Sequence, residues 1–222
     1  MLSFDDQASE ADLRLALVEC GGICYDRRLM TSNDGNLSVR LGEDRVLITP
    51  SGISKGRMHV DDVIVVDVKG RVLEKNAGSQ PSSETPMHLE VYKRRSDVRA
   101  VIHAHPVFAT ALTVAGMDFP TDVLPETLLL LGDVPVTAYA APSSLEDAEA
   151  IRPFIGEHCA ILLRQHGTLT CGAHLEEALL HLERVEHVAE VFWRAWALGH
   201  VEHLAPEARR RLEAIRDELS KR

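Results

Sequence analysis

The pattern of hydrophobic and polar positions predicts a strand-rich first half of the chain. Residues 36–41 alternate in polarity, and a Gly-Glu-Asp turn separates them from a second apolar run at 45–49. This is the pattern of a β-hairpin. A second hairpin is expected from residues 62–67 and 71–74, which flank Lys69-Gly70. The first part of the chain is therefore expected to form antiparallel strands.

Apolar residues at three- and four-residue spacing predict the helices. The first covers residues 8–28, where the Gly21-Gly22 pair is expected to bend or end it. Another covers residues 84–94 and begins behind Ser82 and Ser83, which suit a helix cap. The remaining helices are expected at residues 107–115, 145–156 and 174–198, with a charged amphipathic tail at 206–221.

Short apolar runs at 98–105, 134–139 and 159–164 read as further strands, and a loop is expected through Pro120 and Pro125. The pattern predicts an α/β fold, one three-layer domain over residues 1–222 with a mixed, mainly antiparallel sheet and helices on both faces. Its core is expected at about residues 8–199, with a helical tail at 200–222. A length of 222 residues with 45% hydrophobic content suffices for one such core.

The acidic composition bears on the partners of the protein. The chain has 24 basic and 34 acidic residues, a formal net charge of −10, which argues against a nucleic-acid partner. No apolar run is long enough to cross a membrane, and no leader pattern is visible. We expect a cytoplasmic protein with reduced thiols, because no paired Cys-x-x-Cys spacing connects its cysteines: Cys20, Cys24, Cys159 and Cys171.

Two histidines mark the end of the apolar strand at 98–105. Because alternate side chains of a strand share a face, His103 and His105 point the same way. They either bind a divalent transition metal, or one packs in the core while the other faces solvent. His166 ends the run at 160–164 in the same manner. If both strands belong to one sheet, the three imidazoles leave a fourth position open, as in a catalytic zinc site. By contrast, His181 and His187 are expected on a solvated helix surface.

Five motifs, in this order and spacing, resemble the class II aldolase and adducin head family, and most closely its fuculose-phosphate aldolases. The resemblance spans about residues 8–199, and its motifs lie at 35–40, 48–52, 81–84, 103–106 and 165–167. It implies the same three-layer domain, usually a homotetramer with active sites between subunits. It also implies that His103, His105 and His166 hold Zn²⁺ or another divalent metal such as Mn²⁺ or Co²⁺.

The resemblance further assigns roles to turn residues that are ordinary when taken singly. It implies that Glu84 moves the substrate proton and binds the metal when substrate is absent. It also implies a pocket for the phosphate of a phosphorylated sugar at Asn36, Ser51, Gly52, Ser82 and Ser83. Backbone N–H groups and hydroxyls at such turns suit a phosphate. Without the resemblance, the same residues read as turns, a helix cap and a first-turn carboxylate.

The expected activity is retro-aldol cleavage of a small ketose phosphate to a dihydroxyacetone-phosphate-like product and an aldehyde. Alternatives in the same family are a sugar-phosphate dehydratase, epimerase or decarboxylase, or a non-catalytic adducin-like binding module, which has no need of three histidines. One departure stands out. The aldolases use tyrosines as proton donors, one from a neighbouring subunit and one in the tail, yet this chain has no Tyr after Tyr139. Residues 125–127 occupy roughly the place of the first. The proton donor is therefore left open.

Overall fold

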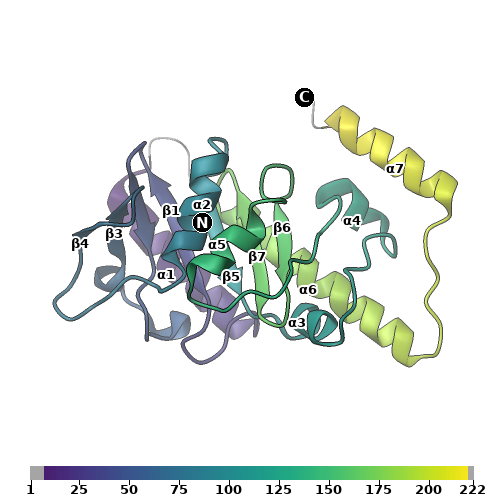
Figure 1. Cartoon of the computed structure of the whole chain (residues 1–222), viewed down its shortest axis with the longest axis horizontal. Helices are drawn as coiled ribbons and strands as arrows, with labels where there is room; N and C mark the ends of the chain where they lie inside the picture. The colour runs from purple at the N-terminus through teal and green to yellow at the C-terminus, as the bar shows by residue number, and fades with distance from the viewer. Residues whose placement is uncertain (1–7, 220–222) are drawn as a thin grey trace.

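The structure, a computed structural model, describes residues 8–219 and is built on one seven-stranded antiparallel sheet (Figure 1). The strand order is β4-β3-β2-β1-β5-β7-β6, which places β5 inside the sheet between β1 and β7. The strands are β1 (Asn36–Leu41), β2 (Arg45–Ile48), β3 (Ile64–Asp67), β4 (Val72–Glu74), β5 (Ala100–Ala104), β6 (Ala160–Leu163) and β7 (Gly167–Gly172). Both predicted hairpins, β1–β2 and β3–β4, are confirmed.

Helices cover both faces of the sheet, as expected for the predicted α/β class. One face packs against α1 and α6, and the other packs against α2 and α5. The helices α3 and α4 pack with α6 beside β6, and α7 lies against α4, far from β4 (Figure 1). The helices are α1 (Glu10–Asp26), α2 (Thr85–Arg94), α3 (Val107–Val114), α4 (Pro125–Leu130), α5 (Leu145–Ile151), α6 (Leu175–Ala197) and α7 (Pro206–Leu219).

Two predictions about strands were wrong. The segment at 134–139 makes only an isolated parallel bridge, between Val136 and Leu162, and Pro135 has no N–H to offer a ladder. Residues 167–172, for which no strand was predicted, form β7 between β5 and β6. All six residues of β7 are buried, and its alternation of Thr168 and Thr170 with Leu169 and Cys171 is a short strand pattern between two glycines.

Several helix boundaries also differ from the prediction. The Gly21-Gly22 pair does not end α1, which continues to Asp26; a Cβ at Gly21 would lie 3.1 Å from the carbonyl oxygen of Lys55, so this glycine permits a close approach. Pro125 begins the short helix α4, in the first turn where proline is tolerated, instead of a loop. The helix predicted at 145–156 ends at Ile151. The tail helix is described from Pro206 to Leu219, and Lys221, where it was predicted to end, lies outside the described residues.

The four cysteines are free thiols, as expected. Between residues 8 and 219, no helix combines the length and the apolar composition needed to span a bilayer.

Candidate metal centre and substrate cavity

The three predicted histidines converge at one point of the sheet. His103 lies in β5, His105 follows it directly, and His166 lies in the turn between β6 and β7. Their ring centroids are 4.7 to 4.9 Å apart, and one nitrogen of each ring lies within 4.8 Å of the others. Three imidazole nitrogens so arranged suit a divalent transition metal.

The backbone explains how two distant segments place these rings together. β5 and β7 are neighbours, with Ala104 opposite Thr168. A Cβ at Gly167 would lie 2.3 Å from the carbonyl oxygen of Ala104 and 2.7 Å from the His105 ring. Only glycine allows so close an approach. The preceding Gln165 adopts a left-handed conformation with φ of 56°. The turn that carries His166 is therefore tight, and its backbone conformation requires glycine at position 167.

Burial keeps two of the imidazoles neutral. His103 is fully buried, and its Nδ1 donates to the carbonyl of Thr168 at 2.9 Å, which leaves the Nε2 lone pair facing Nε2 of His105 at 2.9 Å. Burial lowers the pKa of His103 to about 4. Burial, with His103 and His166 nearby, lowers the pKa of His105 to about 3. A metal requires the neutral ring, so these histidines are in the state that ligation needs.

Glu84 lies against this cluster, as the N-cap of α2 instead of in its first turn. Its Oε2 is 3.3 Å from Nε2 of His103 and its Oε1 is 3.2 Å from Nε2 of His166. Asn36 donates its amide N–H to Oε2 at 2.7 Å. Burial opposes ionisation of this carboxyl, but the histidines and the Asn36 hydrogen bond hold the pKa of Glu84 well below its usual range. A charged carboxylate therefore faces the three imidazoles.

A cavity of about 290 Å³ opens beside the histidines. Glu84, His105 and His166 lie in its wall, together with all the residues expected at the phosphate pocket: Asn36, Ser51, Gly52, Ser82 and Ser83. The structure therefore brings three separate turns to one place. The Ser82 hydroxyl accepts the backbone N–H of Glu84 at 3.3 Å, and the Ser83 hydroxyl lies 2.7 Å from that of Ser143.

Sequence reasoning missed the cation in this cavity, Lys55. Among the described residues in the cavity wall it is the one lysine or arginine. Its side chain is buried, and Nζ donates to the carbonyls of Asn33 at 2.7 Å and Ile53 at 3.0 Å. Burial lowers the pKa of Lys55 to about 8, against the pull of Asp34 and Glu84. The lysine remains mostly charged at neutral pH, and no motif in the sequence marks it.

Asp147 on α5 was also missed. It is buried, its Oδ2 accepts the backbone N–H of Ser143 at 2.9 Å, and its Oδ1 lies 4.0 Å from Nδ1 of His166. Within the described part of the chain, that nitrogen of His166 has no hydrogen-bond partner. A carboxylate behind a histidine is the usual second partner of a metal ligand. Asp147 is placed to take that role.

Two other features fall outside this centre. His181, expected on a solvated surface, is half-buried, and its Nδ1 lies 2.9 Å from the carbonyl of Cys171, whereas His187 is exposed as predicted.

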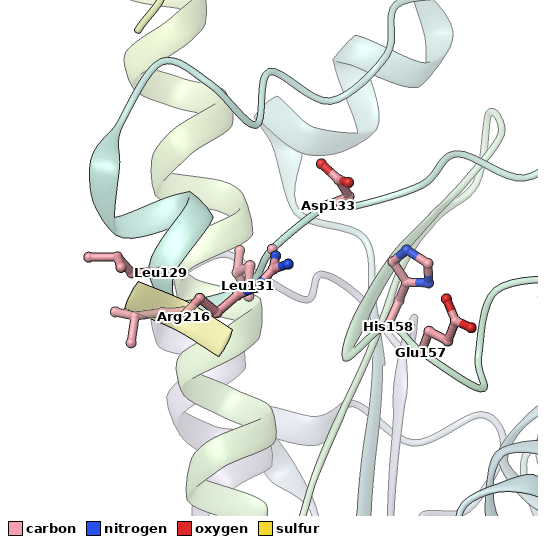
Figure 2. A pocket seen from close by; sticks show the side chains of 8 residues that line it. Leu129, Leu131, Asp133, Glu157, His158 and Arg216 are labelled. Atoms are coloured by element: carbon pink, nitrogen blue, oxygen red, sulfur yellow. The ribbon is translucent and has the colours of Figure 1, made fainter. Parts of the chain in front are cut away.

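A larger cavity, about 420 Å³, lies between α4, α7 and the segment that precedes β6. Figure 2 shows its wall, which includes Asp133, His158 and Arg216. It contains none of the three converging histidines, so the smaller cavity is the candidate site.

Comparison with known proteins supports the expected family. The profile of the family described as "Class II Aldolase and Adducin N-terminal domain" matches residues 15–193. The chain belongs to this family. A 3-oxo-tetronate 4-phosphate decarboxylase of Haemophilus influenzae is 34% identical over 183 residues, covering 80% of this chain and 85% of the relative. An L-fuculose phosphate aldolase of Methanococcus maripaludis is 31% identical and covers 76% of this chain and 89% of the relative.

The class II aldolase fold is equally clear in three dimensions. A solved L-fuculose 1-phosphate aldolase superposes with a TM-score of 0.86 at 30% identity, covering 97% of this chain and 100% of that structure. The range matched by the class II aldolase profile contains every residue of the cavity and the histidine cluster, whereas α7 lies beyond it.

Proposed function

We propose that this class II aldolase family member is a metal-dependent lyase that breaks a C–C bond beside the carbonyl of a small phosphorylated sugar or sugar acid. One observation carries the proposal: the Glu84 carboxylate contacts His103 and His166 at the wall of a cavity lined with hydroxyl and amide donors. A carboxylate beside a three-histidine centre suits proton transfer next to a carbonyl.

His103, His105 and His166 would hold the ion, which we propose is Zn²⁺ or a similar divalent metal such as Mn²⁺ or Co²⁺. The convergence of three imidazole nitrogens fits such an ion, and the hydrogen bond from His103 to Thr168 fixes the tautomer that ligation needs. When bound, the metal supplies Lewis-acid stabilisation of negative charge on the substrate oxygen.

The residues of the chain supply the proton transfers. In retro-aldol cleavage, the Glu84 carboxylate takes the proton of the substrate hydroxyl as the C–C bond breaks and the aldehyde forms. The bonding electron pair stays on the other fragment as an enolate, and the enolate carbon then takes up a proton. Asn36 holds the carboxylate in place during this exchange. The first candidate activity is therefore cleavage of a ketose phosphate to a dihydroxyacetone-phosphate-like product and an aldehyde, because this reaction needs a base.

Decarboxylation is the second candidate. The relative from Haemophilus influenzae is named a 3-oxo-tetronate 4-phosphate decarboxylase, and the chain has no tyrosine after Tyr139 to match the proton donors of the aldolases. Loss of CO₂ from a 3-oxo acid also leaves an enolate, but the bond to CO₂ breaks without a base to remove a proton. Because both candidate reactions form an enolate, both would use the same centre.

The phosphate of either substrate would bind at Asn36, Ser51, Gly52, Ser82 and Ser83. Local donors are needed because the chain carries a net charge of −10 and repels anions at long range. Lys55 adds the positive charge that the five neutral residues lack.

The protein is also proposed to act as a homotetramer, as the resemblance to the aldolase family implies. Exposed apolar side chains on α6, such as Trp196, suit a subunit contact.

The test is product analysis with the metal-loaded protein on L-fuculose 1-phosphate and on 3-oxo-tetronate 4-phosphate. Release of an aldehyde from the first supports the aldolase, and release of CO₂ from the second supports the decarboxylase. Glu84→Gln is the matched control, because it keeps the shape of the side chain and removes its charge. If neither compound is consumed faster by the wild type than by Glu84→Gln, the proposed function is wrong.

A further inference from the structure

A chain of buried hydrogen bonds ends at Glu84. The Tyr92 hydroxyl lies 2.7 Å from the Ser38 hydroxyl, which lies 2.6 Å from Nδ1 of His88. Nε2 of His88 lies 2.6 Å from Oδ1 of Asn36, and the amide nitrogen of Asn36 lies 2.7 Å from Oε2 of Glu84. All five side chains are buried. We call this set, from Tyr92 to Glu84, the His88 relay.

The sheet and α2 place the relay residues together. Asn36 and Ser38 alternate along β1 and so share one face, and Asn36 lies opposite His103 in the pairing of β1 with β5. His88 and Tyr92 are four residues apart on α2, which packs over this face. The polar stripe of β1 is therefore covered by the polar stripe of α2, beneath the candidate metal centre.

The donors and acceptors of the relay fit in one direction. The amide nitrogen of Asn36 can only donate, and it does so to Glu84. The amide oxygen can only accept, so the hydrogen between it and His88 must be on Nε2. With Nε2 protonated on a neutral ring, Nδ1 accepts from the hydroxyl of Ser38. Burial lowers the pKa of His88 to about 4, so the ring is neutral near neutral pH.

The relay fixes the orientation of one amide. If the Asn36 side chain turned over, its oxygen would face the oxygen of Glu84 and its nitrogen would face the protonated nitrogen of His88. Both contacts would be repulsive, and buried groups cannot turn to water instead. In the observed orientation, one N–H of the amide holds Glu84 and the second is not used within the relay, and Asn36 is among the residues that line the cavity.

We propose that His88 is a positioning residue: through Asn36 it holds the Glu84 carboxylate against His103 and His166 and keeps the second Asn36 N–H for the substrate. The proposed function assigns no role to His88. The inference depends on that function in one respect, namely that Glu84 moves a proton.

Two substitutions of the same residue separate this role from simple packing. His88→Gln places an amide N–H2 near the position of Nε2 and keeps a donor for Asn36. His88→Leu keeps the bulk and removes the donor. Val91→Ala is the control for lost stability, because Val91 is buried on the same helix and makes no polar contact with the relay.

The measurement is kcat and KM of the metal-loaded protein on whichever of the two phosphates the wild type consumes. We expect His88→Leu to lower kcat by about 10- to 100-fold with its metal content unchanged, as for other residues that orient a site from behind. His88→Gln should recover most of that loss, and Val91→Ala should lose stability with little change in kcat. Wild-type kcat in His88→Leu, or equal losses in His88→Leu and His88→Gln, would overturn the proposal.

A second measurement does not depend on activity. Long-range ¹H–¹⁵N spectra of the zinc-loaded protein report which nitrogen of each imidazole carries hydrogen, and the signal lost in His88→Gln identifies His88. We expect a neutral ring with hydrogen on Nε2, whereas hydrogen on Nδ1 or on both nitrogens would overturn the relay. If the wild type consumes neither phosphate, the proposed function fails, and this measurement alone then decides the relay.

Discussion

Acid should destabilise the metal-free protein in part through His88. Burial lowers the pKa of this residue to about 4 in the folded state, against the opposing charge of Glu84, whereas an unfolded histidine titrates near about 6.5. Between these values the unfolded chain binds a proton that the folded chain does not. The stability contributed by neutral His88 is therefore complete above about pH 6.5 and falls as the pH drops toward about 4.

The size of this effect follows from the two pKa values. At about pH 5 the unfolded imidazole is almost fully protonated and the folded one is mostly neutral, which lowers the free energy of unfolding by about 2 kcal/mol relative to about pH 7.5. His103 and His105 also have lowered pKa values and add to the total slope. The contribution of His88 is therefore isolated by a variant, His88→Gln, in which only this titration is missing.

The assay is urea unfolding of the metal-free protein at about pH 7.5 and at about pH 5. We expect the wild type to lose about 2 kcal/mol more than His88→Gln between the two conditions. His187→Gln serves as the matched control, since His187 is exposed on α6 and the variant should behave as the wild type does. Equal losses in the wild type and in His88→Gln would refute the argument that burial keeps His88 neutral.

Four further results are expected at the metal centre and the cavity. The wild type should carry close to one divalent metal per chain by elemental analysis and His103→Ala should lose it; equal contents would contradict the ligand set. Glu84→Gln should keep the fold and lower kcat by at least about 100-fold, and near-normal turnover would reduce Glu84 to a helix cap. Phosphoglycolate should inhibit more strongly than glycolate, and replacing Ser82 and Ser83 with alanine should mainly raise KM, whereas equal potency of the two inhibitors on the wild type would exclude the phosphate pocket. Asp147→Asn should weaken metal affinity by about 10-fold or more in chelator competition, and unchanged affinity would leave Asp147 without a role at His166.

Local patterns predicted the strands that form hairpins, because each pair is marked by a turn sequence between two short runs. β1 alternates in polarity, β2 is a short apolar run and a Gly-Glu-Asp turn joins them, so both were predicted with nearly correct bounds although most of their residues are buried. β7 was missed because its alternation, Thr168 and Thr170 against Leu169 and Cys171, is short and lies between two glycines, and its pairing with β5 and β6 comes from the fold. The Gly21-Gly22 pair was misread because its role depends on Lys55, a contact made through the fold and not through local propensity.

Part of the candidate site was also predictable from local sequence patterns. His103, His105 and His166 follow apolar runs, so the pattern alone placed them at strand ends. The residues of the expected phosphate pocket were assigned by family resemblance, and the structure brings them together in one cavity. Lys55 and Asp147 carry no such signal, because their approach to the cavity and to His166 depends on how the segment at 51–57 and α5 pack. Sequence patterns identify the candidate ligands by their residue type and position, whereas only the fold shows which other side chains lie close enough to support them.

The position of β5 inside the sheet has a consequence for local unfolding of the protein. β5 is paired on both sides, with β1, β2, β3 and β4 beyond one edge and β7 and β6 beyond the other. Fraying of a sheet begins at its outer strands, whereas interior strands open only with the cooperative unit as a whole. The backbone amides of residues 100–104 should therefore be among the slowest to exchange with deuterium. Loss of a bound ion need not wait for that opening, because His105 and His166 line the cavity and solvent reaches them directly.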